Sequence, residues 1–223
     1  CGDLYNDKIN YNEHTHISKI YESLAKRVLQ EKEYENIPVP LLHFSGVKVN
    51  KRLSLGLGEG LGDLGKTQVV VINPSFQDLL PLRAWPASYY KELINKLLRT
   101  NINISVLIVG KKNEVKFSQQ FCSEFLPKRV YNLVGQSHSL MELMYVLNHA
   151  DVFVSSDSGP IHFSRMVKDI RVVSLFGPET PELFSPRIEN SIEITAGLNC
   201  SPCFSVYTGC YSRCKKNVCL EEI

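Results

Sequence analysis

The feature that most constrains the fold is a regular alternation of short β-branched segments with longer amphipathic segments. Continuous apolar runs such as QVVVIN are typical of strands that are buried on both faces of a sheet. Strands are expected at 68–73, 104–110, 129–135, 151–157, 171–177 and, at an edge, 191–195, and helices at 87–100, 113–126, 139–150 and 159–167. Strands separated by helices in this way form parallel βαβ units. The sequence therefore predicts an α/β fold with a doubly wound parallel sheet.

The segments outside this alternation indicate how the chain is organised. Apolar residues at helical spacing predict one amphipathic helix over 14–35, inside a first segment that covers 1–53. Residues 54–67, SLGLGEGLGDLGKT, have the composition of a flexible linker. We expect the α/β domain to cover 68–199 and a cysteine-rich segment to cover 200–223.

The Gly-rich segment also matches two phosphate-binding patterns. Gly60, Gly65, Lys66 and Thr67 fit G-x-x-x-x-G-K-[ST], and Gly60, Gly62 and Gly65 fit G-x-G-x-x-G. Both patterns require a helix directly afterwards, so that its backbone N–H groups face the phosphates. Here a strand follows, so the linker interpretation is favoured, and a P-loop NTPase is a weaker alternative.

Charge and hydropathy exclude several classes of protein. Lys and Arg number 25 against 23 Asp and Glu, a net charge of +2, which gives no electrostatic case for binding nucleic acid or a membrane surface. Apolar runs such as 69–72 are far shorter than the roughly 20 residues of a membrane span. The chain starts at Cys1, so it is processed, as a bacterial lipoprotein would be, or is a piece of a longer protein. We expect the protein to be cytoplasmic.

Polar loops follow the predicted strands, at the edge where ligands bind in open α/β sheets. These loops are 73–75, 110–114, 135–137, 156–162 and 177–181. In the loop SDSGPIH, the strand ends at Asp157, Gly159 allows close approach to a ligand, and Pro160 suits a first helical position. An anion could bind at this turn, within reach of His162. Alternatively, Asp157 and Ser158 only cap the helix and His162 is a surface residue.

Three motifs in order carry a resemblance to a known family. They are NPS…LRAWPASYYKELINKLL, LVGQSHSLMELMYVLNHADVFVSSDSGPIHFSRM and VVSLFGPETPELFSP. Together they resemble the second half of family-nine glycosyltransferases, the ADP-heptose:lipopolysaccharide heptosyltransferase family. The resemblance implies a Rossmann-like, donor-binding half of the GT-B fold. It also implies that 1–53 ends an acceptor-binding half whose remainder, with the general base, is absent from this sequence.

The resemblance further implies a donor site. Its residues would be Arg83, Glu114, Asp157, Ser158, Gly159 and His162. Arg83 would neutralise the diphosphate, and Glu114 would bond a nucleotide hydroxyl, unless it is only an exposed carboxylate at a helix start. Arg83, Ser156 and Glu179 depart from the residues that the family usually carries, which leaves the sugar open.

The implied function is inverting transfer of a sugar from a nucleoside diphosphate sugar, with ADP-heptose as the expected donor. The acceptor would be a lipopolysaccharide-type or other glycan, and no cofactor or metal is expected. The protein is not expected to bind nucleic acid or to contain a transmembrane segment. Peripheral contact with the inner membrane could occur through the absent half. A non-catalytic module that binds nucleotide sugars is the alternative.

Five cysteines crowd the end of the chain: Cys200, Cys203, Cys210, Cys214 and Cys219. Short spacings between cysteines are typical of metal sites, but these intervals are irregular and no histidine accompanies them. Metal binding, as in a zinc-ribbon-type interaction protein, disulfides and free thiols all stay open.

Overall fold

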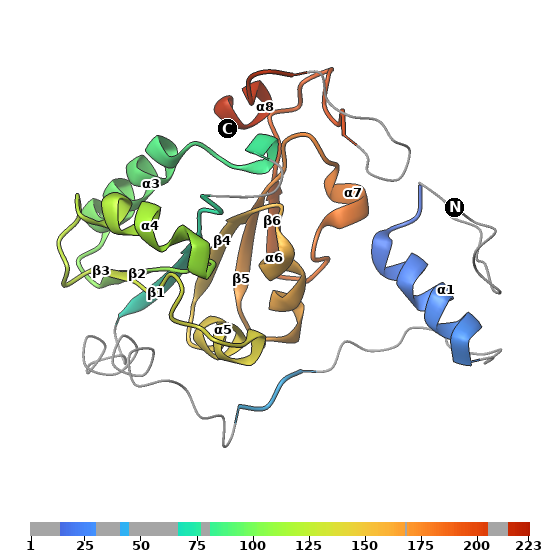
Figure 1. Cartoon of the computed structure of the whole chain (residues 1–223), viewed down its shortest axis with the longest axis horizontal. Coiled ribbons are helices and arrows are strands. Elements are labelled where there is room, and N and C mark those ends of the chain that lie inside the picture. Colours follow the sequence, from blue (N-terminus) through green and yellow to red (C-terminus); the bar gives the residue numbers. More distant parts are fainter. Residues whose placement is uncertain (1–13, 30–40, 45–66, 77–80, 168, 205–213) are drawn as a thin grey trace.

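The computed structural model describes residues 14–29, 41–44, 67–76, 81–167, 169–204 and 214–223. Within these residues, six parallel strands form one sheet in the order β3-β2-β1-β4-β5-β6 (Figure 1). The strands are β1 (Gln68–Asn73), β2 (Ile104–Ile108), β3 (Val130–Asn132), β4 (Val152–Ser156), β5 (Arg171–Leu175) and β6 (Ser191–Ile194). All six coincide with predicted strands, including the edge strand β6.

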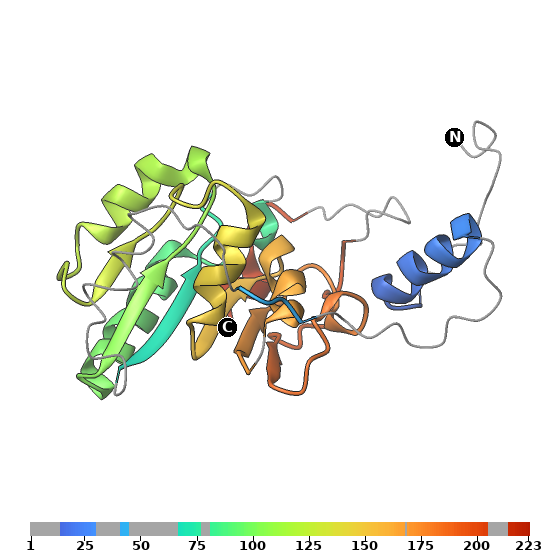
Figure 2. The same cartoon turned by 90° about the horizontal axis from the view of Figure 1, so that it is seen from below.

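Helices cover both faces of this sheet. The α-helices are α1 (Ile17–Leu29), α3 (Ala87–Thr100), α4 (Val115–Cys122), α5 (Leu140–Asn148), α6 (Gly159–Phe163), α7 (Pro181–Phe184) and α8 (Val218–Glu221). Short 3-10 turns are η2 (Pro81–Arg83), η3 (Lys112–Glu114) and η4 (Ser164–Met166). In two perpendicular views, α1 lies beside α7, beyond the end of the sheet that carries β5 and β6 (Figures 1 and 2).

Each central strand contributes side chains to two cores. Val69 and Val71 of β1 belong to the cluster that contains Met144 and Leu147 of α5. Val70 and Ile72, which point the other way, belong to a second cluster with side chains of α3 and α4. This two-sided burial explains why the strand sequences are continuously apolar, and it confirms the doubly wound α/β fold.

The predicted helix start at Ser139 is also confirmed. The Ser139 hydroxyl accepts a hydrogen bond from the backbone N–H of Glu142 at 3.2 Å. The Glu142 carboxylate accepts from the N–H of His138, one residue before the N-cap residue whose N–H a standard capping box would use.

Several predictions concern residues beyond the described part. Helix α1 starts at Ile17 and is described as far as Leu29, so 30–35 are not tested. The linker 54–67 lies outside the described residues except for Thr67, and β1 begins directly after it, which removes the helix that a P-loop needs. None of the described helices is long and apolar enough to cross a membrane.

The strand order places a topological switch between β1 and β4. From β1, the chain runs through β2 to β3 on one side of the sheet and then returns to β4 on the other. In open α/β sheets, the crevice at the carboxyl ends of two such strands is where ligands bind.

Candidate functional site

Three polar side chains tie the carboxyl ends of β1 and β4 together. The Asn73 side-chain amide donates to the hydroxyls of Ser155 and Ser158, at 3.3 and 3.2 Å, and these hydroxyls lie 2.9 Å apart. Ser158 occupies the N-cap position of α6, but within the described residues its side chain makes no capping hydrogen bond. Its hydroxyl joins the crevice network instead, so the capping interpretation of Ser158 is wrong.

The two groups that were predicted to meet at one anion lie side by side. Arg83 Nη1 donates to Asp157 Oδ2 at 3.3 Å, and their side chains are 23% and 5% exposed. The Asp157 N–H donates to the Leu175 carbonyl at 3.0 Å, which fixes the turn beyond β4. The ion pair orients Arg83, while the exposed part of the guanidinium can still meet a ligand.

A first cavity, which we call the inner cavity, has a volume of about 490 Å³ and opens beside β1 and β2. Leu140 and Leu143 give it an apolar wall, and Arg83, Lys111 and Glu114 give it charged groups. Glu114 is only 2% exposed, and its Oε2 accepts from the Lys111 N–H at 2.7 Å. The alternative in which Glu114 is an exposed carboxylate is therefore wrong.

A second cavity of about 610 Å³, the outer cavity, lies on the other side of the same turn. Its polar lining includes His16, Asp157, His162, Arg165 and Glu179. Three residues line both cavities: Arg83, Ser158 and Gly159. The two cavities thus meet at Arg83. A ligand with a central anionic group and an organic group at each end could place the anion beside Arg83 and one organic group in each cavity. All six residues predicted for the donor site line at least one of the cavities.

His162 faces the outer cavity from the first turns of α6 and is only partly exposed. Burial lowers its pKa, and the nearby positive charges of Arg165 and Arg83 lower it further. At neutral pH the imidazole is consequently uncharged and able to donate or accept a hydrogen bond. The interpretation of His162 as an ordinary surface residue is wrong.

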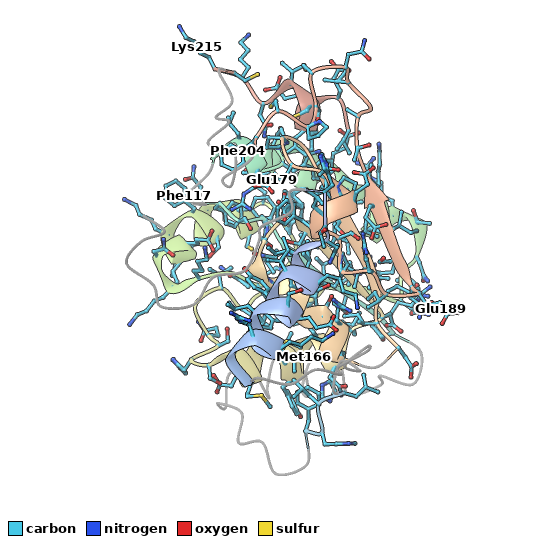
Figure 3. All side chains as sticks on the ribbon, turned by 90° about the vertical axis from the view of Figure 1, so that its right-hand side faces the viewer. Phe117, Met166, Glu179, Glu189, Phe204 and Lys215 are labelled. Atoms are coloured by element: carbon cyan, nitrogen blue, oxygen red, sulfur yellow. The ribbon has the colours of Figure 1, made fainter. Side chains whose placement is uncertain are left out.

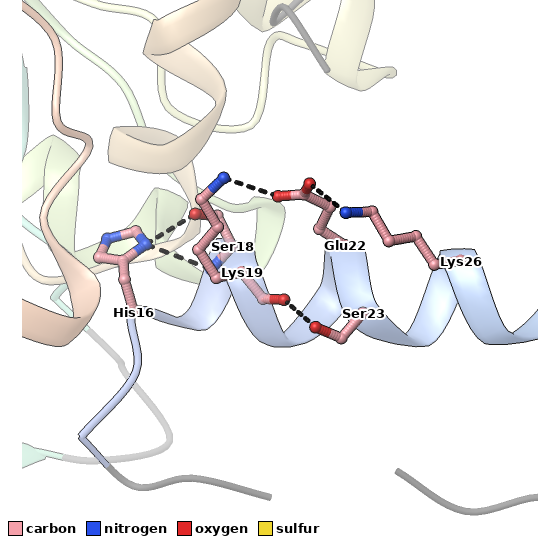
Figure 4. Close-up of polar contacts among 6 residues, drawn as sticks. All are labelled: His16, Ser18, Lys19, Glu22, Ser23 and Lys26. Atoms are coloured by element: carbon pink, nitrogen blue, oxygen red, sulfur yellow. Dashed lines mark hydrogen bonds and ion pairs between the residues drawn. The ribbon is translucent and has the colours of Figure 1, made fainter. Parts of the chain in front are cut away.

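Helix α1 supplies one wall of the outer cavity, which the sequence did not predict. His16 Nδ1 accepts from the Ser18 N–H at 3.2 Å (Figure 4). His16 Nε2 lies 3.1 Å from the Ser185 carbonyl, to which it donates as the neutral tautomer. Burial is the main cause of the lowered pKa of His16. The Ser185 contact spans 169 residues of sequence, which no local pattern could reveal. Farther along α1, Glu22 pairs with Lys19 and Lys26 on the surface, where such pairs add little stability.

Two further charged residues of the outer cavity had no predicted role. Arg165 comes three residues after His162, a spacing that brings side chains to one side of a helical turn and could have identified it. Glu179 is 4% exposed, and its pKa is raised to about 7 by burial and by Asp157, with Arg83 opposing the rise. The sequence singled out Glu179 as a departure from the family but gave no role to it.

The substitution Glu179→Gln is expected to stabilise the protein at high pH. Because the folded-state pKa of about 7 lies above the ordinary 4.5, folding takes up a proton and stability falls as pH rises from about 4.5 to 7. The full penalty corresponds to about 3 kcal/mol at pH 8, which the neutral amide would remove. Urea unfolding of both proteins at pH 4.5, 6 and 8 measures it. Exposed Glu189→Gln is the control, and a gain that does not vary with pH would contradict the expectation.

The cysteine-rich segment lines a cavity that, in the part of the chain that the structure describes, shares no lining residue with the inner or outer cavity. Cys200, Cys203, Cys214 and Cys219 line a small cavity together with Leu82 and Pro178. Burial raises the pKa of Cys219, and the neighbouring thiols contribute to the rise. Among the described residues, no three His, Cys, Asp or Glu side chains form a group that could hold a metal. Cys210 lies outside those residues, so the role of the segment stays open.

Comparison with known proteins agrees with the geometry. The sequence matches glycosyltransferase family 9 (heptosyltransferase) over residues 3–211. It is 28% identical over 128 residues to lipooligosaccharide heptosyltransferase 2 of Campylobacter jejuni serotype O:2, covering 54% of this chain and 38% of that protein. It is 25% identical over 132 residues to lipopolysaccharide heptosyltransferase 3 of Escherichia coli, covering 59% and 37%. The matches thus span well under half the length of these relatives.

Solved structures show the same fold. The E. coli ADP-heptose lps heptosyltransferase II superposes with a TM-score of 0.62 at 19% identity, over 86% of this chain and 58% of that one. A glycosyl transferase family 9 protein from Veillonella parvula gives 0.61 at 18% identity, over 84% and 51%. The predicted Rossmann-like half of a GT-B fold is thereby confirmed. Since the family match runs through almost the whole sequence, this chain belongs to glycosyltransferase family 9, the heptosyltransferases.

Proposed function

We propose that the chain binds the donor for a sugar transfer, with the nucleoside in the inner cavity, the diphosphate at the junction and the sugar in the outer cavity. The observation that supports this most directly is the position of Arg83, which lines both cavities and is held in place by Asp157. The donor would be a nucleoside diphosphate sugar, ADP-heptose first among candidates. The acceptor would be a lipopolysaccharide-type or other glycan.

In the proposed reaction, an acceptor hydroxyl attacks the anomeric carbon from the face opposite the diphosphate. The new C–O bond forms as the bond to the β-phosphate oxygen breaks, and the acceptor proton passes to a carboxylate base. We assign that base to no residue of this chain, in keeping with the expectation that it belongs to the acceptor-binding half.

This chain's part in the reaction is electrostatic. Negative charge grows on the departing diphosphate, and a cation already oriented beside it stabilises that charge more in the transition state than in the ground state. Arg83 is placed for this role, with Arg165 farther along the outer cavity. Neutral His162 would donate a hydrogen bond, and the buried Glu114 would accept one from a nucleotide hydroxyl at the far end.

Nucleoside diphosphates should stabilise the protein against heat without added metal. A ligand at about 100 times its Kd adds about 2.7 kcal/mol, which for a chain of this size raises the Tm by roughly 5–10 °C. The measurement is a thermal-shift screen of ADP, UDP, GDP and ATP, each with Mg²⁺ or with EDTA, and with the free nucleosides as controls. Stabilisation that requires Mg²⁺ and ATP would favour a P-loop NTPase. No response to any diphosphate would contradict the donor site.

The same screen also bears on the alternative of a non-catalytic nucleotide-sugar-binding module. A module would respond to the diphosphates yet transfer no sugar when the full protein is supplied with donor and acceptor. We further propose that the protein lies in the cytoplasm, beside the inner membrane, which fractionation of cells can test.

A further inference from the structure

Strand pairing brings two carboxyl groups together at the junction of the cavities. Parallel β4 and β5 are in register at Ser156 and Leu175, so the turns that follow them leave the sheet side by side. Asp157 is the first residue after β4, and Glu179 is in the loop that follows β5. Both are 4% exposed and both line the outer cavity.

Only Asp157 has a hydrogen-bonded cation here. Arg83 donates to Asp157, whereas the Glu179 carboxyl makes no hydrogen bond to any residue that the structure describes. In Figure 3, Glu179 lies within the body of the protein, whereas Lys215 and Glu189 project at its margins. A buried carboxyl without a protein partner that faces a cavity is available to a ligand.

The ionisation state of Glu179 decides whether an anion can bind beside it. Charged or titratable groups face Glu179 from every side of the outer cavity: Asp157 after β4, Arg83 in η2, His162 in α6, Arg165 in η4 and His16 before α1. If Glu179 were ionised, two carboxylates would face the diphosphate and compete with it for Arg83. If Glu179 is protonated, its O–H can donate a short, charge-assisted hydrogen bond to a phosphate oxygen.

We propose that Glu179 is a donor-binding residue that acts in its neutral form, donating its proton in a hydrogen bond to the diphosphate, so that binding takes up a proton from solvent. The inference rests on the proposed function and adds to it a residue and a pH dependence. The pKa of about 7 for Glu179 in the absence of ligand means that both forms are present at neutral pH, and a bound anion would raise that pKa further.

The experiment is calorimetric titration of the chain. ADP-, UDP- and GDP-glucose are compared first, and the one that binds most tightly is used for the measurements below. Each carries a pyrophosphate diester, whose charge does not change between pH 6 and 8, so any proton that is taken up belongs to the protein. At pH 7.5, the dependence of the observed enthalpy on the ionisation enthalpy of the buffer gives the number of protons. We expect roughly 0.5–1 proton for the unmodified protein and a Kd that rises about tenfold from pH 6 to 8.

Three variants make the assignment specific. The amide of Glu179→Gln can also donate a hydrogen bond. This variant should bind the sugar nucleotide about as tightly as the unmodified protein at pH 6 and about tenfold more tightly than the unmodified protein at pH 8. It should take up no proton at this position. Glu179→Ala should bind roughly tenfold or more weakly than Glu179→Gln at pH 6. His162→Gln, which removes another titratable group that lines the outer cavity, should keep most of the proton uptake.

Three results would overturn the inference. Proton uptake that persists in Glu179→Gln, or that disappears in His162→Gln, would assign the proton to another group. Binding with no proton uptake and no pH dependence would leave the donor site standing but remove Glu179 from it. If none of the sugar nucleotides binds at any pH, both the donor site and the role of Glu179 are wrong.

Discussion

The substitution Arg83→Ala is expected to weaken nucleoside diphosphate binding by about 30-fold or more. Removing one member of a buried, hydrogen-bonded charge pair costs about 2–5 kcal/mol at a binding site. Here the loss has two parts, because the ligand loses its cation and also faces the Asp157 carboxylate without its Arg83 partner. Calorimetric titration with ADP measures the change directly.

Matched variants separate this effect from a general loss of charge. Arg171→Ala removes an exposed arginine at the amino end of β5, the opposite edge of the sheet, and should leave ADP affinity within about twofold, as expected for a distant charge in salt. Arg83→Lys keeps the charge but not the two-pronged geometry, so intermediate affinity is expected. Unchanged affinity in Arg83→Ala would show that the guanidinium does not meet the diphosphate.

The sheet was predictable because its physical signal is local. In β1, β2 and β4, burial on both faces of the sheet requires successive apolar residues. Between consecutive strands, apolar residues recur at helical spacing and so predict a helix. Strand ends such as Ile108 and Asn132 differ from the prediction by one to three residues, because a strand ends where its hydrogen bonds end, not where its apolar residues do.

The candidate site was predictable only where one loop carries several of its residues. Asp157, Ser158, Gly159 and His162 lie in a single turn after β4, so sequence and topology together located them. Arg83 needed the family resemblance, because nothing in its own segment points toward β4. Glu114 lies in a loop that the strand pattern already placed at the ligand-binding edge, but its role needed the resemblance. That they face one crevice follows from the strand order, which the sequence pattern does not specify.

The rest of the site arises from contacts between distant segments. His16 reaches the crevice through Ser185, far along the chain. Glu179 lies beside Asp157 because β4 and β5 are neighbours in the sheet, and its raised pKa depends on burial that a sequence does not display. Of these residues, Glu179 is the one on which the pH dependence of donor binding is proposed to depend.

The substitution Phe153→Ala is expected to lower the free energy of unfolding by about 3–5 kcal/mol, the usual cost of truncating a buried aromatic side chain. Phe153 is fully buried on β4, in the cluster that joins the sheet to α5 and α6. The alanine would leave a cavity beneath the strand that carries Asp157. Urea unfolding monitored by circular dichroism measures the loss, and exposed Phe117→Ala should change stability by less than about 0.5 kcal/mol.

Phe153→Leu keeps the prediction testable if the alanine variant does not fold, since a smaller cavity should cost less, about 1–2 kcal/mol. Comparison with Arg83→Ala then separates folding from binding. Well below its Tm, a Phe153 variant should bind ADP with nearly normal affinity, because Phe153 lines neither cavity and lies in the apolar core beneath the sheet. The Arg83 variant should unfold near the normal denaturant concentration and yet bind poorly. If stability and ADP affinity both fell in the Phe153 variant and in the Arg83 variant, the donor site would not be a set of side chains carried by an independently stable sheet.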